Sequence, residues 1–248
     1  MEVTGETVGQ NQFVNKLPSL VIFDFDQTII NGDTYAILMS LICNGKEEME
    51  KLMACPNLTW ADFNKILFQK LRENEVNTEV IKKKMMSIEL NQNMIEVFDF
   101  IKVNRHKYIP IIISGSIKIV IQAILENYDC LEVIEGIYSH EANIDENDYL
   151  HYVEKEHKNC GECSWAICKA VVLLDVLKND IRKFEKLIYV GDGLIDKCPV
   201  KILTETDSLL PRIDYPLYKV LYEDGYISQV KCKVFPWEDG KKILESFL

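Results

Sequence analysis

The sequence predicts an α/β fold in which the strand ends of a parallel sheet carry a ligand site. Three short apolar runs, at residues 20–24, 109–113 and 187–190, have the length and continuity of parallel strands that are buried on both faces. Polar residues follow each run directly: two carboxylates, then residues 114–116 and residues 191–193. Open α/β sheets bind ligands at this edge, so these residues are the first candidates for a functional site.

The stretch between the first two predicted strands, residues 33–106, is too long for a simple crossover connection. It predicts helices with short breaks, and Thr59 and Asn77 are typical capping residues at two of the starts. The apolar residues that follow keep a helical spacing: Phe63, Ile66, Leu67, Leu71, Met94, Phe98 and Ile101. We therefore expect a helical insertion at 33–106, above a core made of residues 1–32 and 107–248.

The other core elements give weaker signals. Residues 131–134 form a short apolar run that predicts a fourth strand. Residues 137–152 surround a polar turn at 145–148, which indicates a β-hairpin. Residues 166–177 carry the pattern of a helix. These elements complete the predicted core between the second and third strong strands.

The composition excludes several classes of protein. The chain has 248 residues, a formal net charge of −11 and eight cysteines. An acidic chain repels nucleic-acid phosphates, so we expect no nucleic-acid partner. No apolar run reaches the roughly 18 residues of a membrane span, and residues 1–18 lack the pattern of a secretory signal. Without an export signal, the cysteines predict reduced thiols and a cytoplasmic protein.

The strongest local feature is the pair of carboxylates Asp24 and Asp26 after the first predicted strand. Residues two positions apart on an extended chain face the same side. Two unpartnered charges held together cost several kcal/mol, whereas a divalent cation stabilises both of them. A solvated turn with two aspartates is the competing interpretation, and the apolar residues before it make a functional pair the better one.

The other strand ends add groups that suit phosphate chemistry. Asp192 and Asp196, in the glycine-containing turn after the third strand, would add oxygen ligands for a hard cation such as magnesium. The Ser114 hydroxyl would hold a phosphate oxygen or cap the next helix. A lysine is needed to offset the phosphate charge, and Lys169 is the first candidate. Two nearby lysines are alternatives: Lys155 and Lys158.

In chain order, the DxDxT sequence, the strand-end serine, the lysine and the GDGxxD sequence resemble the four motifs of the haloacid dehalogenase superfamily. The helical insertion resembles the C1 cap of that superfamily. More narrowly, the chain resembles the phosphoethanolamine/phosphocholine phosphatase family, which includes a pyridoxal phosphate phosphatase branch. This narrower resemblance rests on five stretches: residues 23–26, 157–169, 191–199, 211–217 and 234–238.

The resemblance implies a Rossmann-like three-layer core and a magnesium-dependent phosphatase that acts on a small phosphorylated metabolite. Asp24 would be the nucleophile, and Asp26 would protonate the leaving oxygen and then activate water. The implied metal ligands are Asp24, the backbone carbonyl of Asp26 and Asp192, with Asp196 acting through water. The residues implied at the phosphoryl group and the substrate are Ser114, Gly115, Ser116, Lys169 and Tyr35.

Two positions depart from the pattern of family members that take amine-bearing substrates. Counted from the motifs, Tyr35 and Gly115 stand where those members carry acids, and Ile195 stands where the family usually has Asn. A buried ammonium without a counter-charge is costly, although Tyr35 would offer a cation–π face. We therefore expect a neutral or apolar organic phosphate or diphosphate as substrate. The alternatives are a phosphocholine/phosphoethanolamine or pyridoxal phosphate phosphatase, a phosphotransferase, and a phosphate-binding non-enzyme of the same fold.

A cluster of thiols precedes the candidate lysine. His157, Cys160, Cys163 and Cys168 have spacings that loosely suit zinc. A tetrahedral site would need four ligands from one short loop, and Cys168 falls within the predicted helix. Reduced thiols that bind no metal are therefore the favoured interpretation, with zinc as the alternative.

Overall fold

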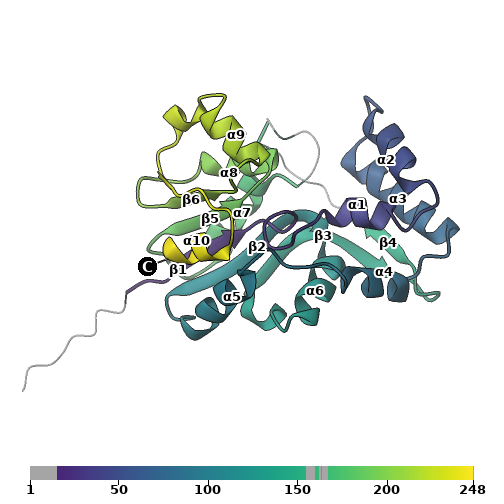
Figure 1. The fold of residues 1–248 in the computed structure, drawn as a ribbon, viewed down its shortest axis with the longest axis horizontal. Coiled ribbons are helices and arrows are strands. Elements are labelled where there is room, and N and C mark those ends of the chain that lie inside the picture. The colour runs from purple at the N-terminus through teal and green to yellow at the C-terminus, as the bar shows by residue number, and fades with distance from the viewer. Residues whose placement is uncertain (1–15, 155–159, 162, 164–166, 248) are drawn as a thin grey trace, which may run out of the picture.

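The computed structural model describes residues 16–154, 160–161, 163 and 167–247, and these form one seven-stranded sheet (Figure 1). The spatial order of the strands is β4-β3-β2-β1-β5-β6-β7. Their bounds are β1 Ser19–Phe23, β2 Tyr108–Ile117, β3 Gly136–Ile144, β4 Leu150–Val153, β5 Leu187–Gly191, β6 Ser208–Pro211 and β7 Lys233–Val234. Neighbouring strands are parallel except for the antiparallel pair β3 and β4. The predicted α/β class with a parallel sheet is confirmed.

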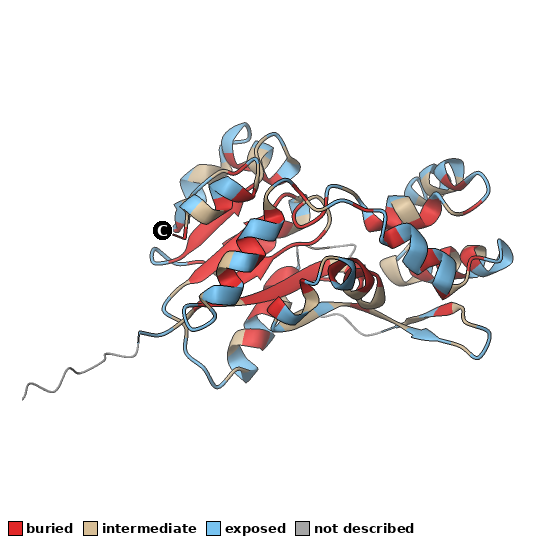
Figure 2. Cartoon of the chain, turned by 60° about the horizontal axis from the view of Figure 1, so that its bottom comes forward, coloured by how far each residue is buried: buried red, intermediate tan, exposed pale blue. Residues whose placement is uncertain are grey.

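Helices cover both faces of the sheet because successive strand residues point to opposite sides. On β1, Val21 and Phe23 belong to one apolar cluster, whereas Leu20 and Ile22 belong to the other. The helices that pack on the first cluster are α5 Met94–Val103, α6 Lys118–Asn127 and α10 Gly240–Glu245. Those on the second are α7 Lys169–Asn179, α8 Lys197–Val200 and α9 Pro216–Tyr222. The result is a three-layer core whose central strands are buried (Figure 2).

The insertion consists mainly of helices, as predicted. Their bounds are α1 Thr34–Met39, α2 Gly45–Met53, α3 Trp60–Glu73 and α4 Thr78–Met85. Helix α3 starts at a capping box made by Thr59 and Asp62, and α4 starts at Asn77, whose side chain accepts from the Val80 N–H. Both predicted starts are therefore confirmed. None of the helices in the described ranges is long and apolar enough to cross a membrane.

The two connections between the core and the insertion run side by side. The Asn31 N–H donates to the Glu89 carbonyl, and the Asn91 N–H donates to the Ile29 carbonyl, both at 2.9 Å. Helix α5 follows the second connection and packs against α10 and β2 of the core. The boundary at residue 106 stays a prediction, and this packing favours an end of the insertion before α5.

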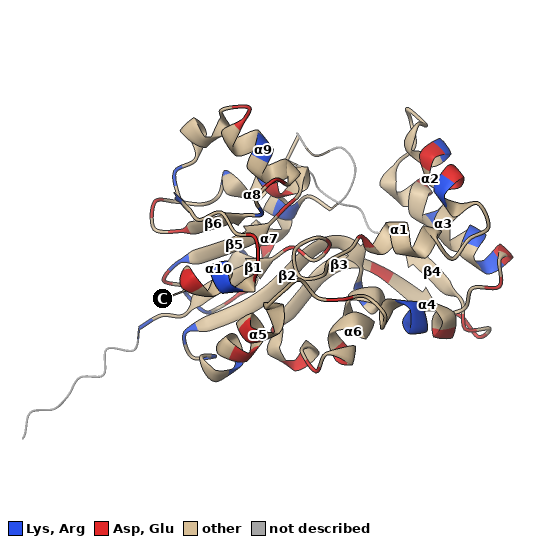
Figure 3. Cartoon of the chain, viewed as in Figure 1, with Lys and Arg blue, Asp and Glu red and all other residues tan. Residues whose placement is uncertain are grey.

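The β3–β4 hairpin packs against the insertion. Helix α3 packs along β4, and the Thr78 N–H at the start of α4 donates to the Asp148 carbonyl at 2.8 Å. Arg72 forms an ion pair with Asp145 at 2.9 Å in the hairpin turn. Basic and acidic residues are both present along α2 and α3 (Figure 3). The predicted hairpin is confirmed, and it joins the core to the insertion.

One predicted strand is wrong. Residues 131–134 do not form a strand, because Leu131–Val133 is a short 3₁₀ helix and β3 begins only at Gly136. Helix α6 ends just before Asp129, which turns the chain with a φ of 53°. The apolar run buries Val133 under the end of α6 instead of pairing with β2. A run of four apolar residues does not distinguish a strand from a buried turn.

The helix predicted at 166–177 begins later in the structure. Helix α7 starts at Lys169, and Ile167 and Cys168 lie before it. Cys168 is the N-cap residue, so the prediction that it lies within the helix is wrong. Residues 164–166 are outside the described ranges. The later start matters for the site, because Lys169 is then the first residue of α7, close to the strand ends.

Candidate active site

The three polar strand ends meet at the carboxyl edge of the sheet. Strand β1 lies between β2 and β5, and the Asp24 N–H donates to the Val190 carbonyl of β5 at 2.9 Å. The ladder between β2 and β3 shifts its register between Ile113 and Ile117, so Ser114 lies in an irregular part of β2. Asp24 and the turn after β5 therefore lie side by side, and the register of β1 with β2 brings Ser114 to the same edge of the sheet.

Lys169 places a positive charge between two carboxylates of the site. Its side chain is fully buried, and its Nζ lies 2.6 Å from Asp24 Oδ1 and 2.6 Å from Asp196 Oδ1. Burial alone would lower the pKa of this lysine, but the two carboxylates outweigh burial and raise it above the usual range. Lys169 is therefore a permanent cation beside Asp24. The alternatives Lys155 and Lys158 lie outside the described residues.

Asp196 organises the turn after β5. It accepts hydrogen bonds from the Tyr189 hydroxyl at 2.6 Å and from the N–H groups of Asp192 and Gly193 at 3.1 and 2.8 Å. A Cβ at Gly191 would lie 2.7 Å from the Asp196 carboxyl group, so this close approach requires glycine there. Asp196 thus fixes both Lys169 and the backbone that presents Asp192.

Three carboxylates form a cluster that suits a cation. Oxygens of Asp24, Asp192 and Asp196 all lie within 4.8 Å of one another, and all three side chains are buried. Burial, together with the Asp196 charge, raises the pKa of Asp24 well above its usual range and that of Asp192 to about 7. One lysine faces three carboxylates, so a hard cation with oxygen ligands would relieve the remaining repulsion. Thr28 orients Asp192 by donating to its Oδ1 at 3.0 Å.

The Asp26 side chain points away from this cluster, toward helix α1. It accepts from the Thr34 N–H at 3.1 Å and from the Thr34 hydroxyl at 2.9 Å, and that hydroxyl lies 2.7 Å from Ser116 Oγ. Burial, and to a lesser extent the charge of Asp33, raises the pKa of Asp26 to about 7. A carboxyl group with such a pKa can give and take a proton near neutral pH. Only the backbone carbonyl of Asp26, and not its side chain, is therefore a candidate metal ligand.

The two departures from the family pattern lie in contact with each other. The buried Tyr35 hydroxyl is 2.9 Å from Asn64 Oδ1 on α3 and 3.2 Å from the Gly115 carbonyl oxygen on β2. The tyrosine ring packs edge-on against Trp60 at 4.8 Å and Phe63 at 5.6 Å between ring centres. Tyr35 therefore joins the insertion to the core with neutral groups, where two acids were expected in amine-binding relatives.

A brace around the first motif could not be predicted from the motifs alone. Gln27 has a left-handed backbone, with φ at 56°, and its carbonyl accepts from Arg212 Nη1. Arg212 also donates to Asn91 Oδ1 at 3.0 Å and stacks on the rings of Tyr215 and Trp237. The signal was present in the stretches at 211–217 and 234–238, which contain Arg212, Tyr215 and Trp237.

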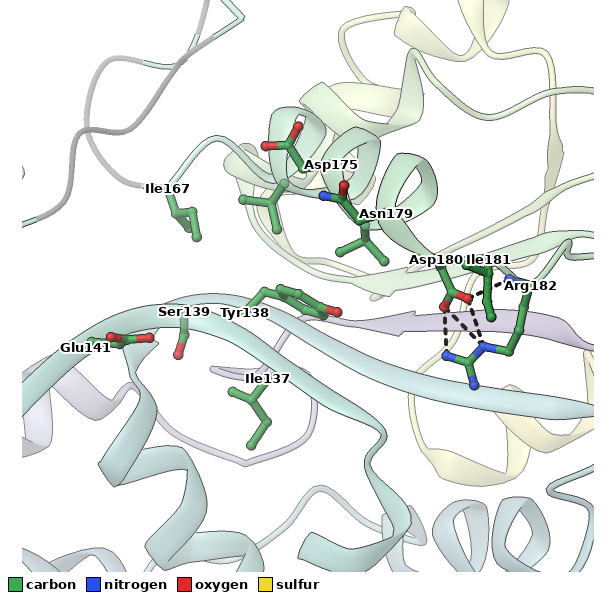
Figure 4. Close-up of a pocket in the computed structure, with 12 residues that line it drawn as sticks. Ile137, Tyr138, Ser139, Glu141, Ile167, Asp175, Asn179, Asp180, Ile181 and Arg182 are labelled. Carbon is green, nitrogen blue, oxygen red and sulfur yellow. Dashed lines mark hydrogen bonds and ion pairs between the residues drawn. The ribbon is translucent and has the colours of Figure 1, made fainter.

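The candidate site is separate from a cavity elsewhere in the described residues. That cavity, of about 680 Å³, lies between β3 and α7 and includes Tyr138, Ser139 and Asp175 in its lining (Figure 4). None of its lining residues belongs to the cluster at the strand ends. In contrast, the exposed fraction of Asp24 is only 6%, so the site at the strand ends is buried.

The chain is similar to known phosphatases over almost its full length. A family model described as "Putative Phosphatase" matches residues 19–248. Pyridoxal phosphate phosphatase PHOSPHO2 of Bos taurus is 30% identical over 230 residues, with 91% of this chain and 95% of the relative covered. The Homo sapiens protein of the same name is 28% identical over 229 residues, with the same coverage of 91% and 95%.

Solved structures show the same fold. Phosphoserine phosphatase, as a phospho-aspartyl intermediate analogue, superimposes with a TM-score of 0.61 at 20% identity, with 93% of this chain and 99% of that chain covered. At this identity the structural likeness shows the fold alone. The phosphatase activity is indicated by the sequence family and its relatives. The chain therefore belongs to this phosphatase family of the haloacid dehalogenase superfamily, and it is a phosphoric monoester hydrolase.

Proposed function

We propose that this phosphatase uses Asp24 as its nucleophile and magnesium as its cofactor to hydrolyse a small organic phosphate. The observation that carries the proposal is the buried Lys169 ammonium at 2.6 Å from Asp24 Oδ1, beside a cluster of three carboxylates. Such an arrangement binds a transferring phosphoryl group by placing cations around it. The magnesium ion, held by Asp24, Asp192 and the Asp26 carbonyl, would supply positive charge at the phosphoryl oxygens.

The chain's own groups account for both halves of the reaction. An Asp24 carboxylate oxygen attacks phosphorus, and Asp26 gives its proton to the leaving oxygen. A water molecule then attacks the phosphorus of the aspartyl phosphate, Asp26 takes the proton, and the bond to Asp24 breaks. Lys169 and Ser114 hold the phosphoryl oxygens during both steps. Thr34, which fixes the Asp26 carboxyl group at 2.9 and 3.1 Å, keeps the acid in place.

Removal of magnesium is expected to stop the reaction. EDTA should abolish turnover, magnesium should restore it, and calcium should restore it poorly because calcium accepts looser coordination. Asp192→Asn should weaken the apparent magnesium affinity on the order of tenfold or more, equivalent to ~1.4 kcal/mol or more. Titration of activity with magnesium measures both effects. Turnover that persists after thorough chelation would contradict the assignment.

The same titration has an expected pH dependence. Burial raises the pKa of Asp192 to about 7 in the metal-free protein, so protons compete with the metal below that pH. The apparent magnesium affinity should therefore fall as the pH drops below 7, by up to about tenfold per pH unit for each proton released. The measurement should cover pH 5.5 to 8, a range of on the order of one to two units around this pKa. If the apparent magnesium affinity is constant over that range, Asp192 is not a ligand.

For the substrate, we propose an organic phosphate without an ammonium group near the insertion. At the positions of Tyr35 and Gly115 the structure has neutral groups in mutual contact, which include Asn64 and Trp60, and no acid. An ammonium there would lose its hydration without gaining a counter-charge. The names of the relatives favour one of the alternatives, pyridoxal phosphate, whose flat ring suits contacts with aromatic side chains. A neutral or apolar phosphate or diphosphate is the broader class.

Substrate preference is tested by kcat/KM on phosphocholine, phosphoethanolamine, pyridoxal phosphate, pyrophosphate and a prenyl phosphate side by side. The two amine substrates should be the poorest. The double variant Tyr35→Asp with Gly115→Asp should shift discrimination toward them by about 1–3 kcal/mol. Tyr35→Phe is the matched control, because it keeps the ring against Trp60 and adds no charge. Clear preference of the unmodified enzyme for an amine substrate would refute this specificity.

A further inference from the structure

Four cysteines come together beside the catalytic helix, at a place separate from the acidic cluster. The Sγ atoms of Cys160, Cys163, Cys168 and Cys198 all lie within 4.8 Å of one another. The separations are 3.5 Å between Cys160 and Cys163 and 4.0 Å between Cys168 and Cys198. Three of the four lie in the short segment before α7, and the fourth lies on α8, 30 residues after Cys168.

These separations match the edges of a tetrahedral metal–thiolate site. With a zinc–sulfur bond of about 2.3 Å, two sulfurs of a regular tetrahedron lie about 3.8 Å apart. The observed values of 3.5 and 4.0 Å lie on either side of it. A disulfide needs about 2.0 Å between its sulfurs, so neither pair is bonded in this structure. Four thiolates in a tetrahedron select zinc or iron among the common metals.

The surroundings favour a closed, structural site. Cys168 and Cys198 are buried in a small apolar cluster with Ala170, whose N–H donates to Cys198 Sγ at 3.4 Å. Hydrogen bonds of this kind from the backbone orient thiolate ligands and stabilise their charge. Four protein ligands leave no open coordination position for water or substrate, which distinguishes structural from catalytic zinc. The fourth ligand is Cys198, in place of His157, which lies outside the described residues.

We propose that Cys160, Cys163, Cys168 and Cys198 bind a structural zinc ion that fixes the catalytic lysine. Cys168 directly precedes Lys169, and Cys198 lies two residues after Asp196. A metal shared by these two segments holds the start of α7 against the turn after β5. It thereby keeps Lys169 at 2.6 Å from Asp196. The zinc site is independent of magnesium, because soft thiolates and hard carboxylates select different ions.

The test is the metal content of the purified full chain, measured by elemental analysis after expression in zinc-supplemented medium. We expect stoichiometric zinc in the wild-type protein and only trace zinc in Cys160→Ser. Added zinc should raise the Tm of metal-stripped wild type but not that of Cys160→Ser. Cys160 is exposed, so this variant keeps its fold even if Cys198→Ser, at a buried position, does not. Cys55→Ser, also exposed and outside the cluster, is the matched control and should retain zinc.

Metal analysis has three outcomes that would overturn the proposal. They are a wild-type protein that neither carries zinc nor binds cobalt as a tetrahedral thiolate complex, a Cys160→Ser variant with full zinc, and stoichiometric iron in place of zinc. A disulfide between Cys160 and Cys163 in freshly purified, metal-free protein would overturn it as well. EDTA binds zinc as well as magnesium. If magnesium alone restores turnover after chelation, the loss of turnover was caused by the removal of magnesium and not by the removal of zinc from the cysteine site.

Discussion

Replacing the proposed nucleophile is expected to have the largest effect on turnover. Asp24→Asn should lower kcat/KM by at least about a thousandfold, a loss of roughly 4 kcal/mol or more in transition-state stabilisation. A carboxamide oxygen is a poor nucleophile, and it also loses the negative charge that attracts Lys169 and the metal. The substitution is isosteric and relieves repulsion among three buried carboxylates, so the fold should remain intact. Steady-state kinetics and a thermal melt measure the two properties.

A surface acid provides the matched control for this substitution. Asp99→Asn makes the same chemical change on the exposed side of α5 and should leave kcat/KM unchanged. Trapping with beryllium fluoride should place the fluoride adduct on Asp24 in the wild-type protein and none in Asp24→Asn. If Asp24→Asn turned over like the wild type, the phosphoryl group would have to pass through another residue and the mechanism would be wrong.

The second largest effect is expected at the buried lysine. Lys169→Met keeps the side-chain stem but removes the ammonium that lies 2.6 Å from Asp24 and from Asp196. We expect kcat/KM to fall by about 10²–10³-fold, because a fixed charge at the phosphoryl oxygens is lost. The free energy of unfolding without magnesium should also fall by about 3 kcal/mol, because two buried carboxylates lose their counter-charge.

The effects of Lys169→Met on turnover and on stability can be distinguished by adding magnesium or by lowering the pH. Magnesium and lower pH should each recover part of the stability, since a cation or a proton relieves the repulsion between Asp24 and Asp196. Neither should recover turnover. Lys178→Met on the exposed side of α7 is the control and should change neither property. Wild-type kcat/KM in Lys169→Met would assign the phosphate-neutralising role to a lysine outside the described residues, Lys155 or Lys158.

The sequence alone predicted the features that depend on neighbouring residues. The central strands appeared as apolar runs because they are buried on both faces, and the helix starts appeared at Thr59 and Asn77 because capping is a local contact. The order of the motifs predicted the superfamily, the fold and the phosphatase reaction, all three now supported by the family and its relatives. The strand predicted at 131–134 was wrong because four apolar residues indicate burial without specifying whether the backbone is a strand or a turn.

The tertiary structure decided how these groups act together. It placed Lys169 between Asp24 and Asp196, directed the Asp26 side chain toward Thr34, and brought Cys198 to the three earlier cysteines. Each of these contacts joins residues from different elements, and no periodicity in the chain records them. Packing of helices on the two faces of the sheet fixes the distances. The sequence thus determined which chemical groups stand at the strand ends, and only the packing of distant segments determined their partners, their burial and therefore their pKa values.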